Sequence, residues 1–259
     1  MKIATWNVNS LRARIERVQE FLEIKEPDIL CLQETKISSD IDQDFIDIIQ
    51  TYGYKANFHG NGQWNGVAII SKNEQTNVIK GFSGDPKNPG VDRNDCRLIR
   101  ATIDNFRIYS VYVPNGREVD SDHYVFKLYW LDRLKADLES EAGAQQQIVL
   151  GDFNIAPRDS DVFDISAFRG MTHVSQKERD ALAAIEACGF VDLGGIWESN
   201  GSFTWWDYRQ GAFHKNHGMR IDLCLSTSVV AKLMGAVSVE RDFRKGSKPS
   251  DHAPVMIEF

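Results

Sequence analysis

Short apolar runs alternate with amphipathic stretches along the whole chain. Residues 2–6 form a strand-like run. Apolar residues then recur at helical spacing from Leu11 to Leu22, and Pro27 stops this helix. The other strands that the pattern predicts cover 28–32, 67–70, 98–103, 106–113, 148–150, 221–225 and 255–259. The other predicted helices cover 41–52, 125–138 and 229–234, with a further one that begins after Ser175.

The balance of these elements predicts the fold class. Strands outnumber helices and several adjoin as hairpins, which favours an α/β fold of two packed, mixed β-sheets with outer helices over a purely parallel sheet. Ser175 followed by Glu178 is a capping-box signature, and Gly189 is suited to end that helix. No linker or low-complexity tract interrupts the alternation, so we expect a single domain over residues 1–259.

Several classes of protein are disfavoured by what the chain lacks. No apolar run approaches the roughly 20 residues of a membrane-spanning helix, and we expect no membrane partner. The first residues run straight into polar ones, unlike a secretory signal, which predicts a cytoplasmic protein. The 4 cysteines have no CxxC spacing, so neither a disulfide framework nor a zinc site is expected.

The net charge bears on nucleic-acid binding. Lys and Arg number 30 against 37 Asp and Glu, a net charge of −7, the opposite of a protein that binds DNA only by neutralising phosphates. This argument weakens if some carboxylates are gathered to hold a divalent metal ion, because the ion then supplies the positive charge that meets a phosphate. The positions of the acidic residues therefore matter more than their number.

Acidic and amide residues recur where apolar strands end. They are Asn7, Glu34, Asn115, Asp152 and Asn154. In layered α/β folds the carboxyl ends of strands converge at one edge of the sheet, so these side chains are expected to line one cleft. Each one alone is better explained as an ordinary turn residue, but that explanation is poorer for all of them together.

Two local clusters add to this pattern. Asp152 and Asn154 lie two apart on an extended segment after Gly151, so their side chains point to the same side. Asp251 and His252 stand next to each other, and such a pair needs another acid across the cleft to fix the histidine tautomer.

Zinc-type histidine spacings and the common nucleotide and serine-hydrolase motifs are absent. Oxygen donors of this kind suit Mg²⁺ or Mn²⁺ and hydrolysis of phosphate esters.

Taken together, these motifs resemble the exonuclease III family of apurinic/apyrimidinic endonucleases, within the wider endonuclease–exonuclease–phosphatase superfamily. The resemblance spans nearly the whole chain and implies a four-layered α/β sandwich with one active site at the edge of the sheets. The motifs that carry it are, in the family's order, TWNVNSLRAR (5–14), LQETK (32–36), NGVAI (65–69), YVPNG (112–116), GDFNIAP (151–157), RID (220–222) and SDHAP (250–254).

The resemblance implies a Mg²⁺ site in which Mn²⁺ can substitute. Glu34 is its principal ligand, Asn7 lies beside it, and Asp251 contributes directly or through water. The side chains implied around the metal are, in full, Asn7, Glu34, Asp152, Asn154, Asp251 and His252.

The resemblance also implies catalytic roles. Asp152 orients or deprotonates the attacking water. His252, oriented by Asp222, binds the scissile phosphate and stabilises its developing charge, and either Asp152 or the Asp222–His252 pair is the general base. The residues that also hold the phosphate are Tyr112, Asn115 and Asn154.

Substrate choice is implied by the aromatic segment FTWWDY (203–208). In the family this segment and the neighbours of Arg220 form an apolar pocket for a flipped-out baseless sugar. The pocket residues here are Trp205, Trp206, Met219 and Ile221, and Phe203 is explained by core packing. We expect Arg117, which follows the Asn115–Gly116 turn, to insert at the lesion. Basic residues that fit DNA on both flanks are Arg12, Arg14, Arg17, Arg241, Arg244, Lys245 and Lys248.

The predicted function is that of a Mg²⁺-dependent DNA repair phosphodiesterase. It incises double-stranded DNA 5′ to abasic sites, trims blocked 3′ ends, leaves a 3′-hydroxyl and acts as a monomer. One alternative is a phosphatase or less specific nuclease of the same superfamily, which the aromatic segment disfavours. Another is a non-catalytic DNA-binding module, which would not require the acids Glu34, Asp152 and Asp222.

Overall fold

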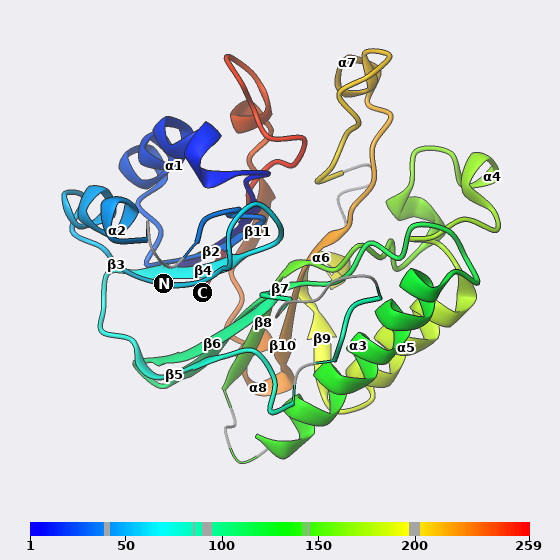
Figure 1. Ribbon diagram of the computed structural model, residues 1–259, viewed down its shortest axis with the longest axis horizontal. Coiled ribbons are helices and arrows are strands. Elements are labelled where there is room, and N and C mark those ends of the chain that lie inside the picture. The colour runs from blue at the N-terminus through cyan, green and yellow to red at the C-terminus, as the bar shows by residue number, and fades with distance from the viewer. Residues whose placement is uncertain (39–41, 85, 90–94, 142, 144–145, 197–202) are drawn as a thin grey trace.

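Two six-stranded sheets form the centre of the protein in the computed structural model (Figure 1). The structure describes residues 1–38, 42–84, 86–89, 95–141, 143, 146–196 and 203–259. The first sheet has the order β11 (Ala236–Val239), β12 (Val255–Glu258), β1 (Lys2–Asn7), β2 (Ile29–Gln33), β4 (Val67–Ser71), β3 (Lys55–His59). The second has the order β5 (Thr76–Lys80), β6 (Leu98–Ile103), β7 (Phe106–Tyr112), β8 (Gln147–Asp152), β10 (Asp222–Thr227), β9 (Phe190–Asp192).

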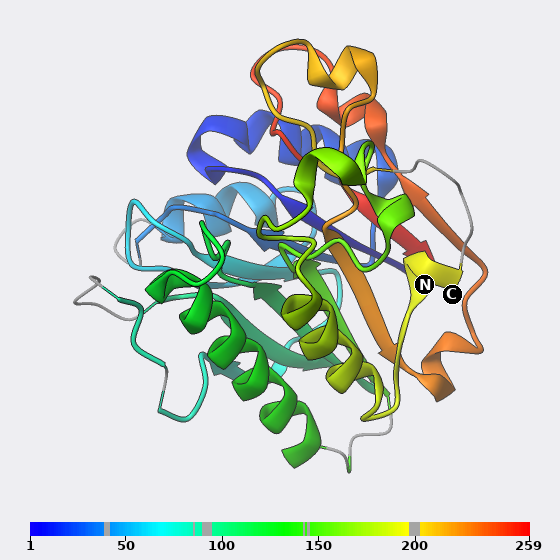
Figure 2. The same cartoon turned by 90° about the vertical axis from the view of Figure 1, so that its right-hand side faces the viewer.

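Helices cover the outer face of each sheet. Helices α1 (Leu11–Lys25) and α2 (Asp42–Gln50) pack on the first sheet, while α3 (Asp122–Ser140) and α5 (Gln176–Glu186) lie side by side on the second (Figure 2). The predicted four-layered α/β sandwich of two mixed sheets is confirmed. Short helices in the connections are η1 (Asp159–Asp161), α4 (Ile165–Phe168), α6 (Leu193–Ile196), α7 (Ala212–Lys215), α8 (Ser228–Ala231) and η2 (Arg241–Arg244). Of the helices described, none is long and apolar enough to cross a membrane.

The facing surfaces of the two sheets make the innermost hydrophobic core. Its side chains include Ile3, Ile69, Ile108 and Leu150, all fully buried. Strands β2, β4 and β8 are buried along their whole length, because one face meets the other sheet and the opposite face meets a helix. This double burial explains why these strands read as continuous apolar runs instead of alternating ones.

Four strands that the hydrophobic pattern does not predict, β3, β5, β9 and β11, are the four edges of the two sheets. Strands β3 (KANFH) and β5 (TNVIK) are partly or mostly exposed and carry polar residues, so they lack an apolar run. Strands β9 (FVD) and β11 (AVSV) are too short to stand out in the pattern. The helix predicted at 229–234 is limited to α8. The capping box at Ser175 is confirmed, since its side chain accepts from the Glu178 backbone and Glu178 reciprocates.

Gly151 is a position where only glycine fits. A Cβ at this position of β8 would lie 1.9 Å from the carbonyl oxygen of Val111 on the neighbouring strand β7. We expect Gly151→Ala to lower the free energy of unfolding by about 3 kcal/mol, the upper range for overpacking a core. Urea denaturation measures this, with Gly143→Ala as the control because a Cβ there meets nothing within 4 Å. Equal stability of the two variants would contradict the prediction.

Candidate active site

The polar residues at the strand ends meet at one edge of the two sheets. Strands β1 and β2 are parallel, as are β7 and β8, so each pair ends on the same side. Asp222 begins the antiparallel strand β10 directly opposite Asp152, and Tyr112 is the partner of Asp152 on the other side. The convergence that the sequence pattern predicts is therefore present in the structure.

Asn7 joins the two sheets at this edge. Its Nδ2 donates to Glu34 Oε1 at 3.0 Å and to Asp152 Oδ2 at 2.9 Å. The side chain is fully buried, so both hydrogen bonds are shielded from water. One amide thus fixes the separation of two carboxylates that come from different sheets.

Glu34 is held as a carboxylate anion. Burial alone would raise its pKa, but the Lys36 ammonium 2.8 Å from Oε2 and the Asn7 amide outweigh burial and lower it. Lys36 Nζ also donates to Asn9 Oδ1 at 2.6 Å. Lys36 and Asn9 belong to the matched motifs but were given no role by sequence reasoning, because their contacts depend on left-handed turns at Glu34 and Lys36.

His252 lies between two carboxylates. Its Nδ1 is 2.8 Å from Asp222 Oδ2, and its Nε2 is 3.8 Å from Asp152 Oδ2. Burial would lower the pKa of His252, but Asp222 and then Asp152 raise it to about 10. Burial raises the pKa of Asp152 to about 7, against the lowering effect of His252. The acid across the cleft that the Asp251–His252 motif requires is therefore Asp222.

The donor atoms at this edge fit a hard divalent cation. Ligand atoms of Asp152, Asp222 and His252 lie within 4.8 Å of one another and form a cluster that could bind a metal ion. Asp222 Oδ1 is buried and has no hydrogen-bond partner among the described residues, and a cation would satisfy it. The Glu34 carboxylate is a second place where a cation could bind, on the side that the Lys36 ammonium occupies. Oxygen donors dominate both places, as Mg²⁺ and Mn²⁺ prefer.

Asp251 is connected to the Glu34 side of the site. Its Oδ1 accepts from Asn9 Nδ2 at 3.1 Å, and its Oδ2 accepts from the indole nitrogen of Trp205 at 3.1 Å. Burial would raise the pKa of Asp251, yet the nearby His252 charge and the Trp205 hydrogen bond lower it. Asp251, a candidate metal ligand, is therefore hydrogen-bonded directly to Trp205 of the aromatic segment.

Two amide side chains face each other beside Asp152. Asn115 Nδ2 donates to Asn154 Oδ1 at 3.2 Å, and the Asn154 backbone nitrogen donates to Asp152 Oδ1 at 2.9 Å. Tyr112 stacks under the Arg97 guanidinium at 4.5 Å, and burial together with the charge of Glu34 holds its pKa well above the usual range. Tyr112 thus stays a neutral hydrogen-bond donor.

His173 is a neighbour of this pair to which sequence reasoning assigned no role. Its Nδ1 is 2.6 Å from the carbonyl oxygen of Asn154 and its Nε2 is 3.5 Å from Asn115 Nδ2. Burial and the nearby Lys127 charge lower its pKa to about 4, so the ring is neutral. The signal available in the sequence was its place two residues before the capping box at Ser175.

The two adjacent tryptophans lie in different clusters. Trp205 is half-buried and packs in an apolar cluster with Met219 and Ile221. Trp206 is fully buried in a separate cluster with Phe203, where Phe213 packs edge-on against it. The structure therefore brings three of the four predicted pocket residues together and places Trp206 in a different cluster.

Most of the basic residues on the flanks hold loops together. Arg14 and Arg17 donate to backbone carbonyls of residues 243–249, and Arg241 and Arg244 lie over aromatic rings. Arg117 is exposed, and its backbone nitrogen donates to Asn115 Oδ1 at 3.0 Å. Lys245 pairs with Asp242.

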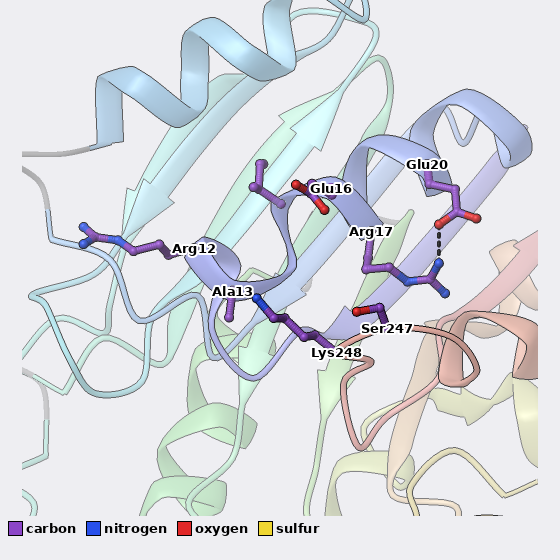
Figure 3. Close-up of a pocket in the computed structure, with 8 residues that line it drawn as sticks. Arg12, Ala13, Glu16, Arg17, Glu20, Ser247 and Lys248 are labelled. Carbon is purple, nitrogen blue, oxygen red and sulfur yellow. Dashed lines mark hydrogen bonds and ion pairs between the residues drawn. The ribbon is translucent and has the colours of Figure 1, made fainter.

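A recess of about 410 Å³ lies between α1 and the loop before Ser250 (Figure 3). Arg12 and Lys248 line it, both are exposed, and neither has a carboxylate partner within the described part of the chain. Figure 3 shows the Arg17 guanidinium directed toward Glu20, with which it pairs, and Lys248 directed toward Ala13. Arg12 and Lys248 are therefore available to a ligand that carries negative charge.

Comparisons with known proteins agree with this geometry. The profile of the Endonuclease/Exonuclease/phosphatase family matches residues 4–252. An exodeoxyribonuclease of Bacillus subtilis is 30% identical over 99% of this chain and 98% of its own length. The structure of the 3′-5′ exonuclease NExo from Neisseria meningitidis has a TM-score of 0.94, 36% identity and coverage of 100% and 99% of the two chains. An AP endonuclease from Archaeoglobus fulgidus has a TM-score of 0.93, 34% identity and the same coverage.

Proposed function

The chain belongs to the endonuclease/exonuclease/phosphatase family, and from this membership we propose that it is a Mg²⁺-dependent DNA repair phosphodiesterase. It incises double-stranded DNA 5′ to abasic sites and trims blocked 3′ ends, leaving a 3′-hydroxyl. The observation that carries the proposal is the pair of carboxylates, Glu34 and Asp152, bridged by Asn7 and faced by His252. The names of the Neisseria and Archaeoglobus proteins, an exonuclease and an AP endonuclease, support the substrate.

Mg²⁺ is assigned to the oxygen-rich edge of the site. Glu34, Asn7 and Asp251 would hold it, with the oxygen atoms of Asp152 and Asn154 near by, and Mn²⁺ would substitute. The ion supplies Lewis acidity to a phosphate oxygen and neutralises part of the charge that repels an attacking hydroxide.

The side chains around the ion have different roles in catalysis. Asp152 orients the attacking water and accepts its proton. Both ring nitrogens of His252 face carboxylates, so the ring carries two protons and acts as a cationic donor to the phosphate instead of a base. The remaining donors to the phosphate are Tyr112, Asn115 and Asn154. These donors stabilise charge where it develops in the transition state.

The lesion pocket is assigned to Trp205, Met219 and Ile221. These side chains form one apolar cluster next to Asp251, which suits a sugar that has lost its base. Trp206 packs in a separate cluster and is not assigned to the pocket. Arg117, exposed after the Asn115 turn, is assigned to contact the duplex at the lesion.

The test is incision of a labelled duplex that carries one abasic-site analogue, beside an undamaged duplex and a duplex with a blocked 3′ end. Each is incubated with Mg²⁺, with Mn²⁺ and with chelator. Metal-dependent cutting at the lesion and removal of the 3′ block are the expected results. If all three duplexes stay intact while a small phosphate ester is hydrolysed, the phosphatase alternative takes precedence.

We also propose that residues 1–259 act as one catalytic unit, a cytoplasmic monomer. The large exposed apolar side chains among the described residues are scattered over several elements, as Ile24, Trp64, Tyr129 and Val229 illustrate, and do not suggest a dimer face. Sedimentation of the free protein and of its complex with a short duplex measures the oligomeric state. A dimer in either sample would overturn the monomer assignment.

Removal of the Trp205 side chain is expected to change substrate preference. Trp205→Ala should slow abasic-site incision by about tenfold more than it slows trimming of ordinary 3′ ends, because only the former needs the pocket. The ratio of the two rates measures the effect. Trp205→Phe keeps a ring but loses the N–H donated to Asp251, and is expected to retain the preference. Equal slowing of both reactions by Trp205→Ala would make it a packing residue.

A further inference from the structure

A fully buried ion pair lies beneath the two amides of the site. Lys127 of α3 and Glu178 of α5 have no exposed side-chain surface, and Lys127 Nζ pairs with Glu178 Oε1. Removing two charges from water carries a large free-energy cost, and a well-packed apolar pair is often at least as stable. Stability alone is therefore a weak explanation for this pair.

The three protons of Lys127 have three acceptors. Besides Glu178, Nζ donates to the carbonyl oxygen of Asn154 at 2.6 Å and to the carbonyl oxygen of Asn115 at 3.2 Å. These are the two residues whose side-chain amides face each other beside Asp152. A single ammonium group thus ties together the loops that follow β7 and β8.

Glu178 extends the contact to a third loop. Its Oε1 accepts from Thr172 Oγ1 at 2.8 Å and from the backbone nitrogen of His173 at 3.0 Å. Thr172 Oγ1 also lies 2.9 Å from the carbonyl oxygen of Asn115. The carboxylate therefore fixes the loop that carries His173 against the same two amide residues.

The space around the pair is closely fitted. A Cβ at Gly116 would lie 3.0 Å from Lys127 Cδ and 3.0 Å from Thr172 Oγ1. Asn154 has a φ of 51°, a left-handed conformation that its surroundings must maintain. Displacement of the ammonium would leave the Asn115 carbonyl with Thr172 Oγ1 and the Asn154 carbonyl with His173 Nδ1, but would remove the group that joins them, so the two amide-bearing turns could shift relative to each other.

We propose that Lys127 and Glu178 are positioning residues, which hold the backbones of Asn115 and Asn154 so that their amides meet the scissile phosphate. This inference rests on the proposed function. Neither charged group touches the substrate, and both act through main-chain carbonyls. A shift of about 1 Å in such donors costs up to about a hundredfold in rate.

The test separates stability from turnover with two variants. Lys127→Met leaves the Glu178 charge buried and should unfold at a lower temperature. Lys127→Met/Glu178→Gln contains no unpaired charge at this place. Its glutamine oxygen can still accept from the Ser175 backbone nitrogen that caps α5, so the melting temperature should recover. We expect kcat of the folded double variant to stay at least about tenfold below wild type with KM within about threefold, because the one group that joins the two carbonyls to each other is gone, and Thr172 and His173 each contact only one of them.

The matched control is Arg107→Met, which removes a buried arginine from its pair with the partly exposed Glu141 at the other end of α3. It should lower stability and leave kcat per folded molecule unchanged. The positions of the amides are read independently from the side-chain ¹H–¹⁵N resonances of Asn115 and Asn154, which should shift in the double variant and stay in place in Arg107→Met.

Two outcomes would overturn the proposal. One is a kcat that returns to wild type together with the melting temperature in the double variant, and the other is a pair of amide resonances that do not move. If the wild-type protein cleaves none of the DNA substrates, the proposed function fails, and the resonances still decide whether the ion pair positions the amides.

Discussion

Replacing Asp152 with asparagine is expected to lower kcat for cleavage by about a thousandfold, within the range found for a lost general acid or base. The introduced carboxamide cannot accept a proton from water, and its amide would point a donor at the Asn7 amide, which now donates to Asp152 Oδ2 at 2.9 Å. The DNA dissociation constant is expected to change by less than about threefold, because the phosphate donors stay in place.

Single-turnover cleavage at saturating enzyme measures the chemical step, and binding to the same duplex in chelator measures affinity. Asp137→Asn is the matched control, since Asp137 is a mostly buried aspartate that pairs with Arg100 away from the site. Turnover of Asp152→Asn close to that of the control would remove Asp152 from the mechanism.

Asp222→Asn is expected to lower kcat by about a hundredfold at neutral pH and to add a pH dependence. Burial lowers the pKa of His252, and Asp222 is the main group that raises it to about 10. Without Asp222 the burial effect dominates, so the pKa falls. The ring then loses its positive charge as pH rises through this lower value, whereas the wild-type ring stays charged up to about pH 10.

The measurement is kcat for both proteins between about pH 6 and 9 at saturating metal and substrate. The ratio of wild-type to variant rate should grow with pH until the His252 of the variant is neutral. The imidazole ¹⁵N shifts of His252 give its protonation state directly. A constant ratio over this range would mean that the charge on His252 does not depend on Asp222.

The sequence predicts the interior of the fold better than its edges. Doubly buried strands such as β2 and β8 require continuous apolar runs, and these runs are visible without a structure. The edge strands β3 and β5 are held by hydrogen bonds to β4 and β6, and their partly exposed side chains leave no such pattern. Backbone pairing across distant segments carries no local signal.

Site residues such as Glu34 and Asp152 were predictable because a polar residue at the end of an apolar strand is visible in the sequence. Contacts between remote segments were not predictable: Glu178 was identified as a helix cap, while its buried partner Lys127 lies 51 residues away. Trp205 and Trp206 show a second limit. Adjacent residues on extended chain point to opposite sides, and the sequence does not say which one faces the site.

The first sheet is built from both ends of the sequence, with β1 between β2 and the late strand β12. During synthesis the early strands therefore wait for residues 255–258 before their sheet is complete. Asp251 and His252, just before β12, arrive at the same late stage. The catalytic edge therefore cannot assemble before Asp251 and His252 have emerged from the ribosome, and the pairing of β1 with β12 is a long-range contact of the kind that forms slowly in folding.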